Sequence, residues 1–185
     1  MTEYIKEDLF LEQMHRKHKI SDVVCDFYTE GCIVALERNG HISKNVYLSV
    51  DGITEKKYRL IWDKKVNTNG WQEDKVIAEF GGYCMAFLLV SELTEFTVLR
   101  QAKTRTGVDF YIGYNEKSRL SDQENFFKDL VRMEVSGILK ENGSNTVQKR
   151  YKKKLDQTRQ SDHQKIPVFI AITEFGSPKS KFLMK

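Results

Sequence analysis

The chain has 185 residues, of which 40% are hydrophobic, 30% charged and 11% aromatic, and its formal net charge is +4. This length is typical of one domain, or of one domain with a small extra lobe. The composition excludes an intrinsically disordered chain, a collagen-like repeat and a disulfide-stapled miniprotein.

The cysteine pattern and the first residues predict an intracellular, cytoplasmic protein. The three cysteines, Cys25, Cys32 and Cys84, show no C-x-x-C spacing and are interpreted as small buried hydrophobic residues. The N-terminal segment lacks the apolar core of a signal peptide. The longest apolar stretch, 83–90, is shorter than the roughly 20 residues that span a membrane, so no membrane anchor is expected.

Residues 1–70 predict an N-terminal lobe made of one helix and a β-meander. Apolar residues at helical spacing indicate an amphipathic helix within 3–17. Three segments rich in β-branched and aromatic residues, 31–37, 45–50 and 57–62, predict strands. This lobe carries eleven basic and eleven acidic residues, so it has no electrostatic signature of nucleic-acid binding. We expect it to serve as a surface for a homodimer or a partner protein.

Residues 71–185 predict an α/β core. A broadly apolar helix begins near Glu73 and runs toward Leu93. Gly81 and Gly82 fall within it, so either the backbone packs very closely there or the helix begins late. Neither alternative is favoured by the sequence.

Five further elements complete this core in the sequence. Strands are predicted at 95–102, 107–114 and 131–138, a basic helix at 145–160, and a buried strand at 168–172. A capping box, Ser121-Asp-Gln-Glu124, begins a short helix over 121–130, which we treat as an insertion. The resulting order predicts a mixed sheet in which a helical crossover leads into a final parallel strand.

Two carboxylates lie inside predicted strands, where acidic residues are depleted. Asp109 belongs to Val108-Asp-Phe-Tyr-Ile-Gly113 and Glu134 to Val131-Arg-Met-Glu-Val-Ser-Gly137. If the two strands are neighbours, both side chains can project from one face and bind one hard cation such as Mg²⁺. The alternative, of equal weight, is that both carboxylates lie on a solvent face or pair with Arg132 or Lys103.

These segments resemble the restriction-endonuclease-like PD-(D/E)XK nuclease superfamily. The resemblance rests on Thr106-Gly-Val-Asp109, on Met133-Glu-Val135, on the basic helix and on the last apolar strand, and it covers about 73–175. It implies an αβββαβ core and a nuclease that hydrolyses phosphodiester bonds in DNA with Mg²⁺ or Mn²⁺. It implies that Asp109, Glu134 and the carbonyl of Val135 bind the metal, with Glu79 as a further acidic residue. Such nucleases serve in restriction, repair or defence against mobile elements.

The chain departs from this family at one position. Ser136 stands where the family expects a lysine two residues after the glutamate, so the cation that would stabilise the transition state is missing there. Either the lysine has moved, or the domain no longer cuts. The moved cation has three candidates: Lys154 or Lys153, each with Gln157 as its polar partner, or Lys103.

The predicted basic helix indicates nucleic-acid binding independently of the resemblance. Segment 145–160 holds six basic residues against one acidic residue, and we take five of them as candidate phosphate contacts: Lys149, Arg150, Lys152, Lys153 and Lys154. The alternative is an ordinary solvated helix. The sequence thus predicts a Mg²⁺-dependent deoxyribonuclease, with a catalytically inactive nuclease-fold module for nucleic-acid binding or protein assembly as the alternative.

Overall fold

The computed structural model describes residues 7–103, 106–114, 130–159 and 165–185. The strands in these ranges are β1 (Glu7–Phe10), β2 (Val46–Gly52), β3 (Lys56–Ile61), β4 (Phe96–Gln101), β5 (Phe110–Tyr114), β6 (Val131–Ile138), β7 (Val168–Glu174) and β8 (Lys179–Met184). The helices are α1 (Asp22–Arg38), α2 (Asp74–Leu93) and α3 (Val147–Thr158), with 3-10 turns at Leu11–Lys17 and Thr68–Gly70.

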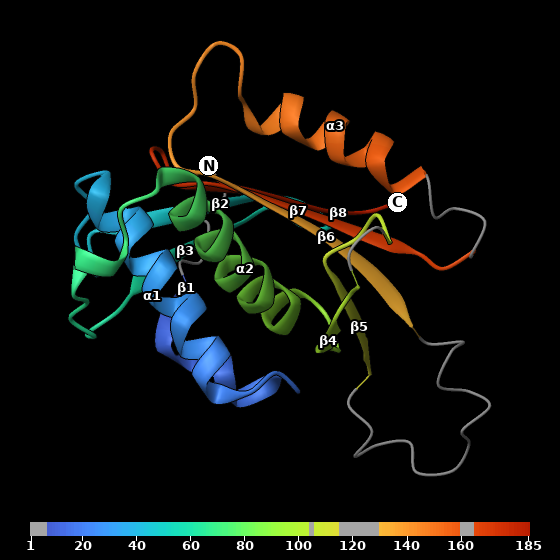
Figure 1. Ribbon diagram of the computed structural model, residues 1–185, viewed down its shortest axis with the longest axis horizontal. Helices are drawn as coiled ribbons and strands as arrows, with labels where there is room; N and C mark the ends of the chain where they lie inside the picture. Colours follow the sequence, from blue (N-terminus) through green and yellow to red (C-terminus); the bar gives the residue numbers. More distant parts are fainter. Residues whose placement is uncertain (1–6, 104–105, 115–129, 160–164) are drawn as a thin grey trace.

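All eight of these strands belong to one sheet, in the order β1-β3-β2-β8-β7-β6-β5-β4. The helices α1 and α2 pack on each other and cover one face, and α3 lies on the opposite face (Figure 1). The large hydrophobic core lies between the sheet and the α1–α2 layer. A smaller cluster forms under α3 from Ile138, Ile170 and Ile172.

The prediction of a mixed α/β fold with a parallel crossover is confirmed. From α2 onward the described elements follow the order helix, three strands, helix, strand. The strands β4, β5 and β6 are antiparallel neighbours, and α3 connects β6 to β7, which is parallel to it. The helix predicted over 121–130 falls almost entirely outside the described residues.

The prediction of an N-terminal helix followed by a three-stranded meander is wrong. Segment 31–37 lies within helix α1, and the part of 3–17 that the structure describes forms β1 and a 3-10 turn. An apolar run without alternation fits a fully buried helix as well as a strand. In α1 the residues from Gly31 to Leu36 are all buried, because α2 and the Leu11–Lys17 turn pack around them. The strands predicted at 45–50 and 57–62 are present as β2 and β3.

Strand β8, like β1, was not anticipated, and it joins the two predicted domains. It pairs antiparallel with β7 and parallel with β2, and it buries Phe182 completely. The segments before and after the predicted boundary at residue 70 therefore contribute strands to one continuous sheet. Lys179 and Lys181 belong to this strand.

The glycines of α2 are explained by close packing, since α2 begins at Asp74 and passes through both of them. A Cβ atom on Gly82 would lie 2.8 Å from the backbone nitrogen of Gly137 in β6, and one on Gly137 would overlap the carbonyl of Ala78. On the other side of α2, a Cβ on Gly81 would lie 3.2 Å from the Cα of Cys32 in α1. These contacts bring α2 directly onto β6.

Helix α2 is long and apolar enough to cross a membrane by length and composition alone. In the structure 67% of its apolar window is buried, and it packs against α1, β4, β6 and β7. These are the contacts of a core helix. The three cysteines are free and buried, as the sequence indicated.

Candidate functional site

The site is formed where β5 and β6 separate. The two strands pair from Ile112↔Val131 to Phe110↔Met133, and the backbone nitrogen of Asp109 then donates to Met133 O at 3.0 Å. The next donor on β6, the nitrogen of Val135, is satisfied by the carboxylate of Asp109 at 2.8 Å. The Asp109 side chain thus takes the place that a further β5 residue would have occupied.

Glu134 lies beside this point and projects toward α3. Met133 and Val135 are part of the core under α1 and α2, so strand alternation turns Glu134 to the other face. There its Oε1 atom forms an ion pair with Nζ of Lys154. The exposed fractions of the two side chains are 6% and 18%, so the pair is largely shielded from water.

The packing of α3 explains why Lys154 reaches Glu134. Val147, Tyr151 and Leu155 pack against the isoleucines of β6 and β7. Their four-residue spacing fixes the rotation of the helix about its axis. Arg150 and Lys154, which share the flank next to this apolar face, then lie toward the site, whereas Lys152 and Lys153 face solvent.

The electrostatics show two carboxylates competing for one cation. Burial raises the pKa of Asp109, and the Val135 N–H and the charge of Lys154 oppose that rise. Burial and then the charge of Asp109 raise the pKa of Glu134, again against Lys154. Without a further cation, two close negative charges are unfavourable in this buried setting.

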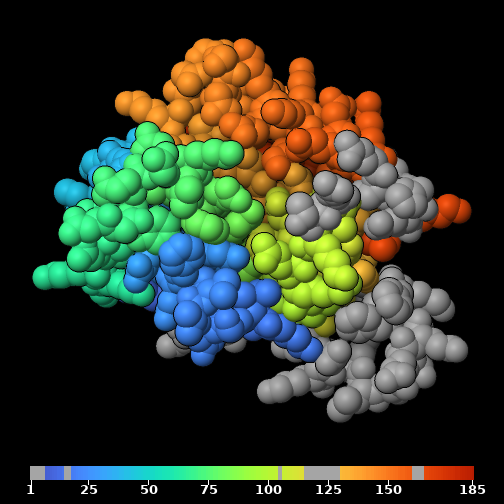
Figure 2. All heavy atoms as spheres, in the orientation of Figure 1, coloured from blue at the N-terminus to red at the C-terminus, as the bar shows by residue number. Residues whose placement is uncertain are grey.

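A cavity of about 490 Å³ opens onto Asp109 and Lys154, the residues that contact Glu134. It lies between the first half of α2, the free edge of β6 and the flank of α3. On the face shown in Figure 2, the region of α2 (green) borders that of α3 (orange). The lining of the cavity includes Lys75, Glu79, Tyr83, Asp109, Val135, Ser136, Lys140, Asn145, Arg150 and Lys154.

The structure brings together some of the candidates from the sequence and not others. Asp109, Glu79, Val135, Arg150 and Lys154 all line the cavity, and Glu134 contacts Lys154. The other candidates do not line it: Lys103, Lys149, Lys152 and Lys153 are exposed, and Gln157 is half-buried. Of the three candidate cations, only Lys154 lies at the carboxylates.

Glu79 is exposed at the edge of the cavity and accepts a hydrogen bond from the Tyr83 hydroxyl at 3.0 Å. Sequence reasoning missed Tyr83, although its position four residues after Glu79 on a helix is a usable signal. It also missed Lys75, Lys140 and Asn145. These three come from separate segments, so only the packing of α2 and α3 around β6 brings them together.

The donor set suits a small hard cation with a partial protein shell. Within the described residues, no group of three or more His, Cys, Asp or Glu side chains could hold a metal ion. Asp109 and Glu134 supply two carboxylates, and Mg²⁺ is usually bound by one or two carboxylates together with waters and substrate phosphates. The raised pKa values of both carboxylates fit a site that an added positive charge would relieve.

Comparisons with protein-family models, with curated proteins and with solved structures found no match.

Proposed function

We propose that the chain is a metal-dependent nuclease of the restriction-endonuclease-like type that hydrolyses phosphodiester bonds in DNA. The observation that carries this proposal is that Asp109 and Lys154 line one cavity and that Glu134 contacts both of them, through an ion pair with Lys154 and a hydrogen bond with Asp109. The two carboxylates match the acidic pair that would bind the metal ion. The amine of Lys154 matches the cation that the sequence lacks at position 136.

The topology supports the same proposal. The order α2, β4, β5, β6, α3, β7, with β6 and β7 parallel, is consistent with the αβββαβ order that the sequence resemblance implies, and β8 follows it. Asp109 precedes the second of these strands and Glu134 lies in the third. Fold alone does not imply function, so this agreement adds to the side-chain argument without replacing it.

Asp109, Glu134 and the carbonyl of Val135 would hold the metal. Even-numbered residues of β6 face β7: the Arg132 N–H donates to the carbonyl of Pro167, just before β7, and the Ile138 carbonyl accepts from the N–H of Phe175, just after it. The carbonyl of Val135 is therefore directed to the free edge, on the cavity side. When bound, Mg²⁺ or Mn²⁺ would polarise the phosphodiester and lower the pKa of a bound water.

Lys154 would supply the missing cation. Its amine lies on Glu134 and lines the cavity, so it can stabilise negative charge that develops on a phosphate held there. Ser136 lines the same cavity and cannot carry that charge. Glu79 would act at the rim as a further acidic group, and Gln157 has no part in the proposal.

The basic helix α3 would contribute phosphate binding in two ways. Arg150 and Lys154 face the cavity, whereas Lys149, Lys152 and Lys153 are exposed. Exposed lysines attract a nucleic-acid backbone without base preference, and each phosphate they neutralise makes the affinity more salt-dependent. The surface of α3 would therefore concentrate DNA near the cavity.

A cleavage assay tests the activity. Plasmid DNA, linear single- and double-stranded DNA and RNA are incubated with the protein in Mg²⁺, Mn²⁺ or EDTA. We expect metal-dependent cutting of DNA that falls by about 10²-fold or more in Asp109→Asn, Glu134→Gln and Lys154→Met. Asp63→Asn, an exposed carboxylate outside the cavity, is the matched control. Cutting that survives all three substitutions would refute the assignment.

The ion pair itself favours the alternative of an inactive binding module, because Lys154 already compensates part of the charge of Glu134. This alternative predicts no cutting and no effect of divalent cations on stability. A thermal-shift titration decides between the two: at 100 times its Kd, a cation that binds only the folded state adds about 2.7 kcal/mol of stability.

A further inference from the structure

The two ends of the cavity differ in charge. Asp109 and Glu79 line one end, and Lys75, Lys140 and Arg150 line the other. The remaining charges are compensated, since Lys154 pairs with Glu134 and Asp74 pairs with Arg38 at 2.6 Å. Among the described residues, none of the three cations at the basic end has a carboxylate partner.

The three cations lie on the same side of the acidic end. Lys75 precedes Glu79 by four residues on α2, and Arg150 precedes Lys154 by four residues on α3, so each lies one helical turn, about 6 Å, away. Ala78 and Gly82 pack on Gly137, so the start of α2 lies beside the end of β6, where Lys140 follows. The basic end is thus built from three elements.

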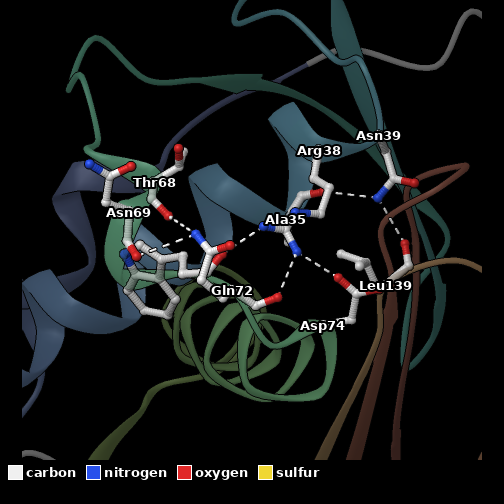
Figure 3. A network of polar contacts seen from close by, with 9 residues as sticks. Ala35, Arg38, Asn39, Thr68, Asn69, Gln72, Asp74 and Leu139 are labelled. Atoms are coloured by element: carbon white, nitrogen blue, oxygen red, sulfur yellow. Dashed lines mark hydrogen bonds and ion pairs between the residues drawn. The ribbon is translucent and has the colours of Figure 1, made fainter.

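Two hydrogen-bond networks hold this end in place. Asn145 accepts from Nε and Nη2 of Arg150 at 3.1 and 2.7 Å, which fixes the plane of the guanidinium. Arg38 donates to Asp74 and to the carbonyl of Trp71, both at 2.6 Å, and Asn39 donates to the carbonyl of Leu139 at 2.9 Å (Figure 3). The end of α1 therefore ties the start of α2 to the residue before Lys140.

We propose that Lys75, Lys140 and Arg150 form a subsite for a second phosphate of the bound strand. This inference rests on the proposed function and adds a direction to it: the strand runs along α3, from Lys154 toward Arg150. A separation of about 6 Å corresponds to one or two nucleotides, since each nucleotide of a strand rises about 3.4 Å along the duplex axis. Arg150 is suited to this role because Asn145 occupies only its Nε–Nη2 edge, and the Nη1–Nη2 edge of the planar guanidinium matches two phosphate oxygens.

A length series of oligonucleotides tests the subsite by binding. Oligothymidylates with one, two, three and four phosphodiester linkages are titrated in Ca²⁺ and followed by calorimetry. The wild type should gain about tenfold in affinity at the second or third linkage, the value of one charge-assisted contact. Arg150→Ala should lose most of this step, Arg150→Lys should keep part of it, and the triple variant with Lys75→Ala and Lys140→Ala should lose it all.

Two control variants distinguish phosphate binding at the subsite from general electrostatic attraction of DNA. Lys65→Ala removes an exposed lysine outside the cavity and should leave the step intact. Lys153→Ala removes one from the outer face of α3 and should lower affinity equally at every length. A step that persists in the triple variant, or that Lys153→Ala abolishes, overturns the subsite. If the protein does not cut DNA but shows the gain in affinity with length, the proposed nuclease activity is refuted and the subsite is retained.

Discussion

Asp109 and Glu134 lie in an environment that disfavours their charged forms. Both carboxylates are largely removed from water and lie close together, with Lys154 as their only described ion-pair partner. Burial raises the pKa of both carboxylates, and the charge of Asp109 raises that of Glu134 further, which costs folding free energy whenever both are ionised. An arrangement of this kind is expected where a ligand supplies the missing positive charge.

Removing one of the two charges should therefore stabilise the metal-free protein. In Asp109→Asn the amide oxygen can still accept from the Val135 N–H, so the substitution removes charge and keeps the hydrogen bond. We expect a higher thermal midpoint than the wild type in EDTA, and no further rise with Mg²⁺. Asp109→Ala, which also loses the hydrogen bond, should be less stable than Asp109→Asn. Equal losses in both variants would contradict this account.

The same shifts predict a dependence of stability on pH. Asp and Glu titrate near 3.9 and 4.3 when unfolded, and both pKa values are raised in the folded protein. The folded state then binds protons more tightly, so this contribution to stability is complete below about pH 4 and is lost as pH rises through the raised values. Urea unfolding in EDTA at several pH values should show this loss in the wild type and a smaller one in Asp109→Asn.

The contact between α2 and β6 is the element-scale feature on which the site depends. The absence of side chains at Gly82 and Gly137 lets the helix lie directly on the strand. This places Glu79 and Tyr83 at the cavity that Asp109 and Val135 line from the sheet. A wider spacing would move the rim of the cavity away from its carboxylates.

A methyl group at the contact between α2 and β6 should be poorly tolerated. In Gly137→Ala the new Cβ meets the backbone of Ala78, which cannot rotate away as a side chain would. Overpacking costs typically about 1–3 kcal/mol, and we expect the upper end of that range or more here. Gly143→Ala, where nothing lies within 4 Å of the new Cβ, is the control. Equal free energies of unfolding for the two variants would rule out the close-packing explanation.

At the scale of the whole molecule, the sheet unites the two halves of the sequence. β2 pairs with β8, and α1 packs on α2. Together these contacts cover one edge of β8 and much of the apolar surface of α2. The N-terminal half therefore contributes to the same core that holds the candidate site, in addition to any role as a partner surface.

A fragment of residues 71–185 should not fold alone, because it exposes the α1-facing side of α2 and the edge of β8. We expect no cooperative thermal transition for this fragment. Co-expression with residues 1–70 should restore one, since the sheet and helix contacts can form between separate chains. A stable, monomeric 71–185 fragment would instead support an independent C-terminal domain.

The sequence predicted those features that follow from local pattern. β-branched and aromatic residues located β2 to β6 and a continuous apolar run located β7, with small errors at their ends, and unusual carboxylates inside two predicted strands marked Asp109 and Glu134 as a pair to examine. The buried run in α1 was misread because a short apolar run fits a buried helix as well as a buried strand. β8 was missed because its apolar residues are interrupted by lysines and give only a weak strand signal.

Tertiary structure alone decided which cation lies at the carboxylates. Lys103, Lys153 and Lys154 are equivalent in the sequence, and a rotation of α3 set by Val147, Tyr151 and Leu155 selects Lys154. It also decided that the separation of β5 from β6 opens a cavity with an acidic and a basic end. Residue type determines what chemistry is possible in this chain, whereas the packing of distant segments determines which of those residues meet.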